Sequence, residues 1–379
     1  MNKTARGGVV VLGSTGAIGR STLAVVRRSR ERTVVGLACG SNLASLKRQI
    51  VEFSPRYVWF GGDCRALRAA FPGVRFLSGA QGLIDIATAD GADTVVAAIP
   101  GISSLPAVLA ALESGRTVGL ATKEVLVVAG HLVMKTARRS GAIILPVDSE
   151  HNAIFQLLRH EGTAHVSRII LTASGGPFFG RKSLSGVTVR QALVHPVWKM
   201  GRKITVDSAT LMNKAFEMIE AQHLFDLSPR QIDVLIHREA VVHGIVEFAD
   251  GNLLALLSKP DMRFALSNVL SYPERAPAHW GRLDLAAVET LSFEKPPAGA
   301  GWLKLARLAM GQAGTTLPVV LNAANEAAVE RFLAGRLPFE RIVRVVEQVT
   351  AHHTPRPCRD LRTVMEADEE ARRETEKLL

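Results

Sequence analysis

Three carboxylates in two short segments have the types and spacing of a site for a divalent metal ion. Asp148 and Glu150 are two residues apart in PVDSEHN, and Glu217 closes the later segment VDSATLMNKAFE. In extended backbone such a pair points to the same side, and its charges repel unless a cation joins them. Carboxylate oxygens suit Mg²⁺ or Mn²⁺ better than Zn²⁺. Alternatively, Asp148 or Ser149 caps a helix that runs to Leu158, and the two roles are compatible.

The second segment also carries groups that suit a phosphate. A helix is predicted over 209–225, and Asp207 or Ser208 could cap its N-terminus. That N-terminus, with Ser208, Asn213 and Lys214 nearby, would form a phosphate cradle, and the third carboxylate follows on the same stripe of the helix. Spacing alone leaves an alternative open, namely a solvated helix face with an intrahelical lysine–glutamate pair.

Two loop segments could complete such a site. TASGGP (172–177) follows a predicted strand, and two glycines after Ser174 favour an anion-binding turn. HPVWKMG (195–201) places Trp198 in a stretch that ends in glycine. We interpret it either as a mobile lid over a substrate or as a packed loop.

A glycine loop near the N-terminus predicts a dinucleotide site. GSTGAIG (13–19) follows a predicted strand and opens a helix, which lets backbone N–H groups approach a pyrophosphate. An ordinary tight turn is the alternative. The second strand ends in ACGSN (38–42), which lacks the acid that usually holds the ribose hydroxyl of NAD. Lys47 and Arg48 are near in sequence, so NADPH is the expected cofactor.

The elements that must position these groups change character along the chain. The first 147 residues alternate short β-branched runs with helical stretches such as 43–53, 105–113 and 123–138, which predicts a Rossmann-like, doubly wound parallel sheet. The strands are predicted at 9–12, 33–38, 57–60, 75–77, 94–99, 117–120 and 143–147. Asp148 follows the last of them, where ligands of such sheets bind.

The second half predicts an α+β catalytic domain with a mainly antiparallel sheet, and then a C-terminal helical bundle. Its strands are predicted at 168–171, 234–237, 241–248 and 253–257, the last three in direct succession. Its helices are predicted at 302–312, 318–333, 339–352 and 360–378. The domain boundaries that follow are 1–147 for the dinucleotide domain, 148–275 for the catalytic domain, 276–300 for a linker and 301–379 for the helical domain.

The bulk properties exclude several classes of protein. The chain has 379 residues, 47% of them apolar, and no apolar run of the length of a membrane span. A net charge of +11 is scattered among only 5% aromatic residues, so we expect no nucleic-acid partner but steering of anionic small molecules. Because the first strand begins almost at the N-terminus, we expect no signal or transit peptide and a bacterial-type cytoplasmic protein.

These segments together closely resemble the 1-deoxy-D-xylulose 5-phosphate reductoisomerase family. The matching stretches follow the expected order over most of the chain, and the block at 195–221 is very specific to the family. They are GSTGAIGRST (13–22), ATKE (121–124), PVDSEHNAIFQ (146–156), LTASGGPF (171–178), HPVWKMGRKITVDSATLMNKAFEMIEA (195–221) and LNAANEAAV (321–329).

The resemblance implies a role for each matching residue. Asp148, Glu150 and Glu217 match the metal ligands, for Mg²⁺ or Mn²⁺. The residues that match substrate-binding positions are Lys123, Ser149, Glu150, Ser174, His195, Ser208, Asn213, Lys214 and Glu217. The residues that match catalytic or flap positions are Lys123, Glu150, His151, His195, Trp198 and Met200. The residues that match NADPH contacts are Gly13, Ser14, Thr15, Gly16, Ala17, Ile18, Gly40, Ser41, Asn42, Thr122, Glu124 and Gly201.

The implied reaction is a retroaldol–aldol rearrangement of 1-deoxy-D-xylulose 5-phosphate and its reduction to 2-C-methyl-D-erythritol 4-phosphate, by a homodimer, in isoprenoid precursor synthesis.

The chain departs from the family pattern at Thr122, at Ser41, and in the stretches 97–105 and 236–244. One rival hypothesis is an NADP-linked, metal-assisted enzyme for another sugar phosphate, which the altered 236–244 stretch would favour. The other is a non-catalytic dinucleotide sensor, but that would be marked by lost metal ligands, and none is lost.

Overall fold

The computed structural model describes residues 7–379, which form two compact units, each built around one β-sheet. Unit 1 consists of the described residues up to Val125 together with Val133–Asn152 and Asp261–Gly281. Unit 2 consists of Leu126–Leu132, Ala153–Pro260 and Arg282–Leu379. The four-part division predicted above stays a prediction, because the two units are defined by packing and both are discontinuous in sequence.

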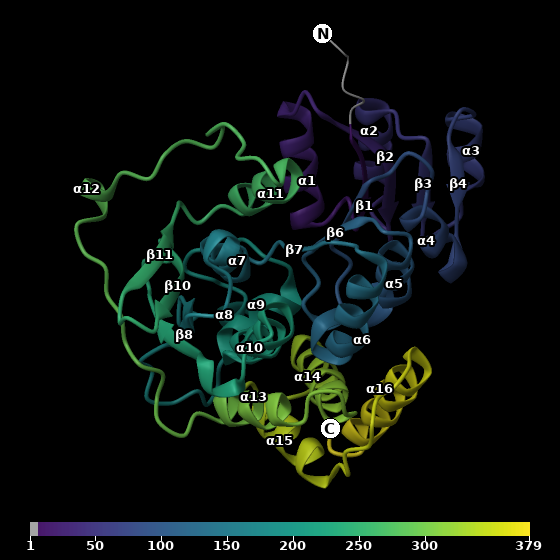
Figure 1. Ribbon diagram of the computed structural model, residues 1–379. Helices are drawn as coiled ribbons and strands as arrows, with labels where there is room; N and C mark the ends of the chain where they lie inside the picture. Colours follow the sequence, from purple (N-terminus) through teal and green to yellow (C-terminus); the bar gives the residue numbers. More distant parts are fainter. Residues whose placement is uncertain (1–6) are drawn as a thin grey trace. The chain divides into compact units, whose positions relative to one another are not determined.

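The sheet of unit 1 has seven parallel strands in the order β4-β3-β2-β1-β5-β6-β7, which is the predicted Rossmann-like arrangement (Figure 1). Its central strands are continuous apolar runs because helices cover both faces, and Val9 to Leu12 are fully buried. The strand order reverses between β1 and β5, where ligands of such sheets bind. The strands are β1 Gly7–Leu12, β2 Arg32–Cys39, β3 Tyr57–Phe60, β4 Arg75–Leu77, β5 Thr94–Ala97, β6 Thr117–Leu120 and β7 Ile144–Pro146.

A helix follows every strand of unit 1, as the alternating pattern predicts. These helices are α1 Ala17–Arg28, α2 Leu43–Phe53, α3 Arg65–Ala70, α4 Gly79–Ala87, α5 Leu105–Glu113, α6 Glu124–Ser140 and α7 Ser149–Glu161, with the 3-10 turn η1 Ile102–Ser104. Residues 126–132 of α6 and 153–161 of α7 belong to unit 2. The late helix α11, Met262–Ser271, packs against α1. Trp280 helps to hold this segment, because the guanidinium carbons of Arg28 and Arg263 lie 4.9 and 4.3 Å from the centroid of its ring.

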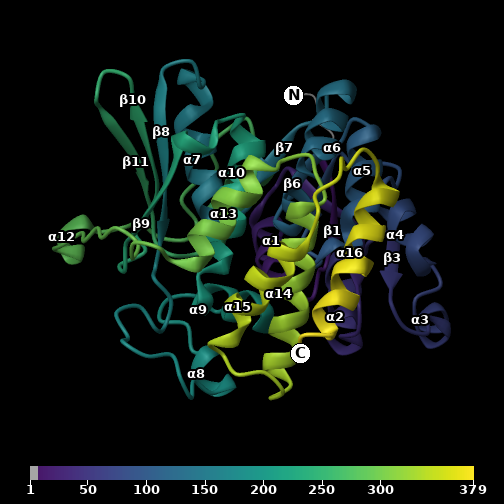
Figure 2. The same ribbon diagram turned by 90° about the horizontal axis from the view of Figure 1, so that it is seen from below.

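The sheet of unit 2 has the order β11-β10-β8-β9 (Figure 2). Its strands are β8 Val166–Ala173, β9 Ile232–Ile236, β10 Val242–Phe248 and β11 Leu253–Leu257. The pairs β8–β10 and β10–β11 are antiparallel, which agrees with the predicted mainly antiparallel sheet. The last three strands follow one another along the chain without a helix, as predicted. However, β9 does not pair with β10; it lies on the other side of β8 and runs parallel to it.

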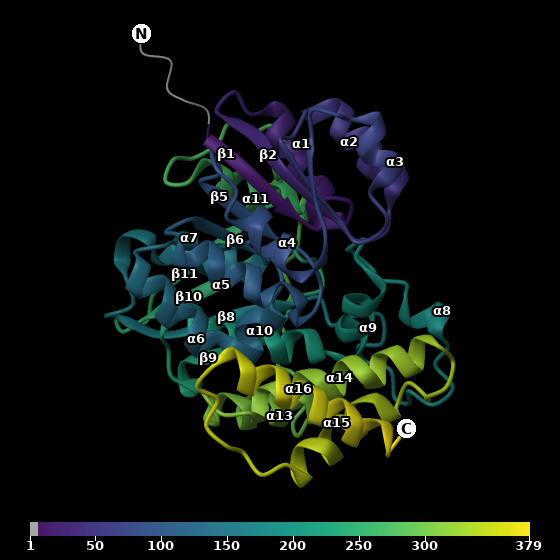
Figure 3. The same ribbon diagram turned by 90° about the vertical axis from the view of Figure 1, so that its right-hand side faces the viewer.

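The C-terminal helices of unit 2 pack together as predicted (Figure 3). They are α13 Gly301–Gly311, α14 Leu317–Leu333, α15 Arg341–His352 and α16 Leu361–Glu376. Helix α14 is the centre of this bundle, since it contacts α13, α15 and α16. The preceding stretch contains only α12, Leu285–Val288, and one bridge between Ile236 and Glu294. Within residues 7–379, no helix has the length and apolar character needed to cross a bilayer.

The helix predicted over 209–225 is confirmed from Met212 to Phe225, but its predicted start is wrong. The chain forms α9, Arg202–Thr210, and then α10, Met212–Phe225, and Leu211 between them has a left-handed φ of 63°. Asp207 and Ser208 therefore lie inside α9, and neither caps a helix as predicted. The left-handed conformation costs a leucine about 1–3 kcal/mol of backbone strain, so the surrounding structure must hold it. Glycine is the usual residue at such a break, and no glycine marks this one in the sequence. The remaining helices of unit 2 are the short α8, Val189–Ala192, and the 3-10 turn η2, Pro229–Gln231.

Candidate active site

The glycine loop of unit 1 is built so that only glycine fits at two of its positions. Gly13 has a φ of 88°, and a Cβ there would lie 2.5 Å from the carbonyl oxygen of Ala98. A Cβ on Gly19 would lie 2.3 Å from the carbonyl oxygen of Gly13. The loop is held to β2, since the N–H groups of Gly13 and Ser14 both donate to the carbonyl oxygen of Ala38 (3.0 and 2.8 Å). The turn therefore has the tightness that a pyrophosphate-binding loop requires.

The start of α1 offers backbone N–H groups to an anion. Gly16 precedes the helix without a side-chain cap, and the first turn contains no acid. A Cβ on Gly16 would meet only one atom, the Gly13 carbonyl oxygen at 3.3 Å, so the approach to the helix end is open. Ala17 and Ile18 form the first turn behind it. Unsatisfied N–H groups and the helix dipole suit a phosphate, so this part of the structure fits a dinucleotide.

The end of β2 agrees with the predicted absence of an acid. Gly40 and Ser41 are exposed, and a Cβ on Gly40 would meet no atom within 4 Å. The side chain of Asn42 accepts from the N–H of Ser45 at 3.1 Å and thereby caps α2. Thr15 reaches this end of the strand, because its Oγ1 lies 3.3 Å from the sulfur of Cys39.

Two departures from the family pattern contact each other beside the glycine loop. The hydroxyl of Thr122 donates to the carbonyl oxygen of Ile99 at 2.8 Å, inside the altered 97–105 stretch. The preceding carbonyl, that of Ala98, is the group that prevents any side chain at Gly13. Glu124 is buried at the start of α6. The altered turn is thus part of the wall of the glycine loop.

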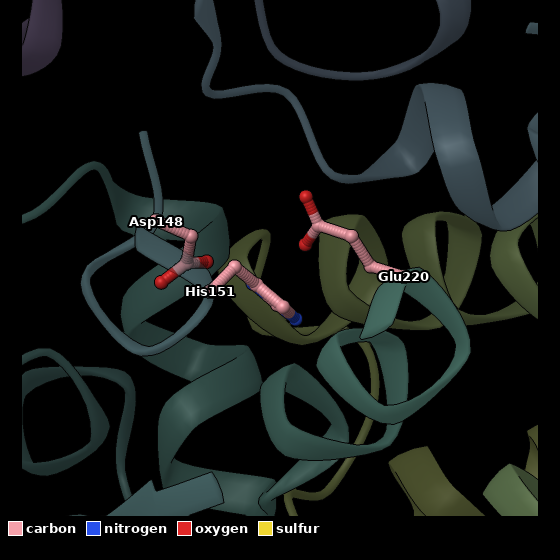
Figure 4. A group of neighbouring side chains, drawn as sticks. All are labelled: Asp148, His151 and Glu220. Carbon is pink, nitrogen blue, oxygen red and sulfur yellow. The ribbon is translucent and has the colours of Figure 1, made fainter. Parts of the chain in front are cut away.

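The acidic segment lies where α7 begins. Asp148 directly precedes the helix, and its carbonyl oxygen accepts from the N–H of Asn152 at 2.8 Å. Oxygens of Asp148 and Glu150 lie within 4.8 Å of each other. The hydroxyl of Ser149 donates to the carboxylate of Glu150 at 2.5 Å. The side chains of Asp148 and His151 both project from the start of α7 (Figure 4).

Lys123 forms a salt bridge with Asp148, and both side chains are largely buried. Burial alone would raise the pKa of Asp148, but the charges of Lys123 and His151 outweigh it and hold that pKa far below its usual value. Asp148 is therefore ionised, as a metal ligand must be. Carboxylates in this state are hard oxygen donors that fit Mg²⁺ or Mn²⁺.

In unit 2, α10 buries the charged groups that the spacing places on one stripe. Lys214 is 3% exposed and Glu217 is 1% exposed, which excludes the solvated helix face. Glu217 accepts from both Lys214 and Asn213. Lys214 Nζ also donates to the carbonyl oxygen of Thr172 at 2.5 Å, so the ammonium group lies at the end of β8.

The serine–glycine turn after β8 lies against α9. Gly176 has a φ of 67°, and a Cβ there would lie 2.6 Å from the carbonyl oxygen of Ser208. Ser174, two residues after the Thr172 carbonyl that Lys214 contacts, begins this turn. The turn that begins at Ser174 thus lies against the backbone of Ser208, and Lys214 reaches the end of the strand that precedes this turn. The phosphate role of Ser174, Ser208, Asn213 and Lys214 stays a prediction.

The flap segment 195–201 is held to the same turn by His195. Nδ1 of His195 accepts from the N–H groups of Val197 (3.1 Å) and Trp198 (2.8 Å). Nε2 therefore carries the proton of the neutral ring and faces Ser174 Oγ at 3.1 Å. Burial lowers the pKa of His195 to about 4, which keeps the ring neutral.

The rest of the flap reaches two other elements. Trp198 faces the ring of His243, with 6.3 Å between centroids. Met200 is half-buried, and Gly201 is the N-cap of α9 in unit 2.

Sequence reasoning missed three groups at this site. Glu220, on α10 (Figure 4), is 1% exposed, and its position one turn after Glu217 was the available signal. The Thr172 carbonyl is a backbone group, and no sequence signal marks it. Asn325 on α14 donates to Asp207 at 2.8 Å, a contact between residues 118 apart.

Family models match three parts of the chain. The model described as 1-deoxy-D-xylulose 5-phosphate reductoisomerase matches residues 9–130. The model of the C-terminal domain of that reductoisomerase matches residues 144–225, and a DXP reductoisomerase C-terminal domain model matches residues 257–374. The matches include the glycine loop, the acidic segment and α10.

Full-length relatives carry the same description. The 1-deoxy-D-xylulose 5-phosphate reductoisomerase of Moorella thermoacetica is 48% identical, over 96% of this chain and 96% of the relative. That of Thermodesulfovibrio yellowstonii is 44% identical, over 97% of this chain and 98% of the relative. A crystal structure of DOX-P reductoisomerase in complex with NADPH, fosmidomycin and magnesium is similar with a TM-score of 0.90 at 38% identity, over 98% of both chains.

Proposed function

The chain belongs to the 1-deoxy-D-xylulose 5-phosphate reductoisomerase family, and from this we infer that it converts 1-deoxy-D-xylulose 5-phosphate to 2-C-methyl-D-erythritol 4-phosphate. The reaction depends on NADPH and a divalent metal ion, in line with the related crystal structure that contains NADPH and magnesium. The observation that carries the assignment of the site is the pairing of its carboxylates with buried lysines. Asp148 is paired with Lys123, and Glu217 is paired with Lys214.

We propose that Asp148, Glu150 and Glu217 hold the metal ion. The ion would act as a Lewis acid toward the carbonyl and hydroxyl oxygens of the substrate. Lys123 balances the charge of Asp148 in their ion pair. A bound metal ion would balance that charge instead, and the ammonium group of Lys123 could then contact the substrate. Ser149 and His151, on the same turn, are proposed as substrate-contacting and catalytic groups.

The substrate phosphate is proposed to bind unit 2 at the group formed by Ser174, Ser208, Asn213 and Lys214. His195 presents a fixed N–H toward Ser174 and joins this group, and Trp198 and Met200 of the flap would exclude water. Binding the phosphate away from the reacting carbons lets remote binding energy orient them for cleavage and rejoining of the carbon–carbon bond.

NADPH, which supplies the hydride, is proposed to bind unit 1 along the glycine loop, Gly13 to Ile18. Ser14 shapes this loop, because its buried hydroxyl donates to Gln49 Oε1 at 2.8 Å and its backbone N–H donates to the carbonyl oxygen of Ala38 at 2.8 Å. Gly40, Ser41 and Asn42 would contact the adenosine ribose, where no acid repels a 2′-phosphate. Thr122, Glu124 and Gly201 are proposed as further cofactor contacts.

We also propose a homodimer that acts on its small-molecule substrate in the cytoplasm. Strand β11 is an edge of its sheet, and Leu253 and Leu254 on it are 57% and 44% exposed. Edge strands with exposed apolar side chains need cover, and a second copy of the chain would provide it.

The assay that tests this function follows NADPH absorbance with purified protein, 1-deoxy-D-xylulose 5-phosphate and Mn²⁺, and repeats it with a chelator. We expect metal-dependent oxidation of NADPH with stoichiometric formation of 2-C-methyl-D-erythritol 4-phosphate. Tight NADPH binding without oxidation would instead point to a different sugar phosphate.

A further inference from the structure

A buried amide links the C-terminal bundle to the helix that carries Ser208. Asn325 on α14 donates from Nδ2 to Asp207 Oδ1 at 2.8 Å, and the two residues are 0% and 2% exposed. The neighbours of Asn325 in the sequence LNAANEAAV are mostly small and apolar, as suits a central helix of a bundle. A polar pair in such a place is costly unless its hydrogen bonds are made, so its presence calls for an explanation.

The position of Asp207 on α9 suggests that explanation. Gly201, the last residue of the flap, is the N-cap of α9, and Ser208 directly follows Asp207 on this helix. Lys203 forms an ion pair with Asp207 at 2.9 Å, but it lies on the same helix and cannot fix the helix in space. Asn325 is the partner of Asp207 that comes from another element.

Helix α9 has weak local anchors at its two ends. Gly201 gives no side-chain cap, and the last turn ends in the left-handed Leu211. Its register must therefore be set by tertiary contacts, among which α14 packs directly on α9. The Oδ1 of Asn325 meets no hydrogen-bond donor within residues 7–379, a cost that an apolar residue would avoid.

We propose that Asn325 is a positioning residue for the substrate phosphate. By holding Asp207, it fixes the register of α9 and so places Ser208 and the end of the flap around the phosphate. The C-terminal bundle thereby acts on substrate binding through one amide. This inference rests on the proposed phosphate role of Ser208.

The test compares Asn325→Ala with Asn322→Ala, a matched control on the same helix. Asn322 is also 0% exposed, and its hydrogen bond to Glu326 at 3.3 Å stays within α14. We expect Asn325→Ala to raise KM for the sugar phosphate about tenfold, the effect of about 1.4 kcal/mol, with little change in kcat. Asn322→Ala should leave KM unchanged even where it lowers Tm equally. An equal rise of KM in both variants, or none in Asn325→Ala, would overturn the proposal.

A second pair of variants keeps the test valid if Asn325→Ala folds poorly. Asp207→Asn retains an oxygen acceptor for Asn325 and should keep KM near the wild-type value, whereas Asp207→Ala should behave like Asn325→Ala. Calorimetric binding of inorganic phosphate gives a readout without turnover and should weaken in parallel. Absence of turnover in the wild-type protein would refute the proposed function, while unchanged phosphate binding in both Asn325→Ala and Asp207→Ala would refute this inference alone.

Discussion

At the scale of single residues, two lysines balance the charge of the proposed metal ligands. Lys123 pairs with Asp148 in unit 1, and Lys214 pairs with Glu217 in unit 2. All four side chains are largely buried, and a buried charge without a partner costs several kcal/mol. The pairs therefore give each of these buried carboxylates a counter-charge before an ion binds.

Glu217→Gln should nearly abolish turnover while NADPH binding stays close to normal. The change keeps the size of the side chain but removes the charge that both the metal and Lys214 would use. We expect kcat to fall by more than about a hundredfold, since even the outer partners of metal ligands can contribute that much. Turnover assays over a Mn²⁺ titration and NADPH binding by fluorescence would measure this, and normal turnover would refute the metal assignment.

Lys214→Ala should mainly weaken substrate binding. A hydrogen bond to a charged group contributes about 1.5–3 kcal/mol, so KM should rise about tenfold to about a hundredfold. Thermal denaturation serves as the control, because the variant leaves the buried Glu217 with only Asn213 of these two partners. An unchanged KM in a folded variant would count against the phosphate role.

Acid should destabilise the protein partly through His195. Burial lowers the pKa of this residue from 6.5 to about 4, so the unfolded chain binds the proton more readily. Stability is therefore full above about pH 6.5 and falls as pH drops toward about 4. Denaturant unfolding across this window should show a shallower decline for His195→Asn, whereas an identical decline in both proteins would show that the ring does not contribute.

At the scale of elements, α6 contains a close fit that a methyl group would break. The helix departs from helical geometry at Ala129, and the ring of His223 lies against Gly130. A Cβ on Gly130 would lie 2.2 Å from Cδ2 of His223, far inside contact distance. This packing joins α6 to α10, the helix that carries Lys214 and Glu217.

Gly130→Ala should lower the free energy of unfolding by about 1–3 kcal/mol, the usual cost of overpacking. Gly311→Ala is the matched control, because Gly311 is also helical and a Cβ there would meet no atom within 4 Å. Denaturant titration would measure both. The double variant Gly130→Ala/His223→Ala should lose less than the sum of its single changes, and full additivity would contradict the proposed clash.

The sequence predicted elements best where local pattern and packing agree. Strands β3, β4, β6 and β11 and helices α2 and α5 begin and end at the predicted residues. The break at Leu211 could not be predicted, since no glycine or proline marks it and tertiary contacts hold it. The position of β9 beside β8 could not be predicted either, because the order of strands in a sheet depends on contacts between residues distant in sequence.

The same distinction holds within the candidate site. The ion pair between Lys214 and Glu217 joins residues three apart on one helix, so it could be predicted from helical spacing. The pairs Lys123–Asp148 and Ser174–His195 join residues 25 and 21 apart and needed the fold. The resemblance to the family supplied the proposed roles, and the contacts supply the physical reason for some of them.

At the scale of the whole molecule, the chain returns to its first unit late in the sequence. The segment Asp261–Gly281 belongs to unit 1, although the residues on both sides of it belong to unit 2. Arg32 secures the return by donating to the carbonyl oxygen of Leu270 at 2.7 Å. Units built from interleaved segments cannot be separated by one cut of the chain, which argues against simple truncation experiments.

The edge of the second sheet gives the prediction that concerns assembly. Leu253 and Leu254 on β11 are exposed on successive positions, so they point to opposite faces of the strand. Leu254→Lys would place a charge where a second copy must pack, and we expect dimer affinity to fall at least about a hundredfold. Val51→Lys is the matched control, since Val51 is 71% exposed on α2 as an isolated apolar side chain. Light scattering after size exclusion should give a dimer for the wild type and Val51→Lys and a monomer for Leu254→Lys. A monomeric wild type would refute the homodimer itself, whereas a dimeric Leu254→Lys would place the interface away from β11.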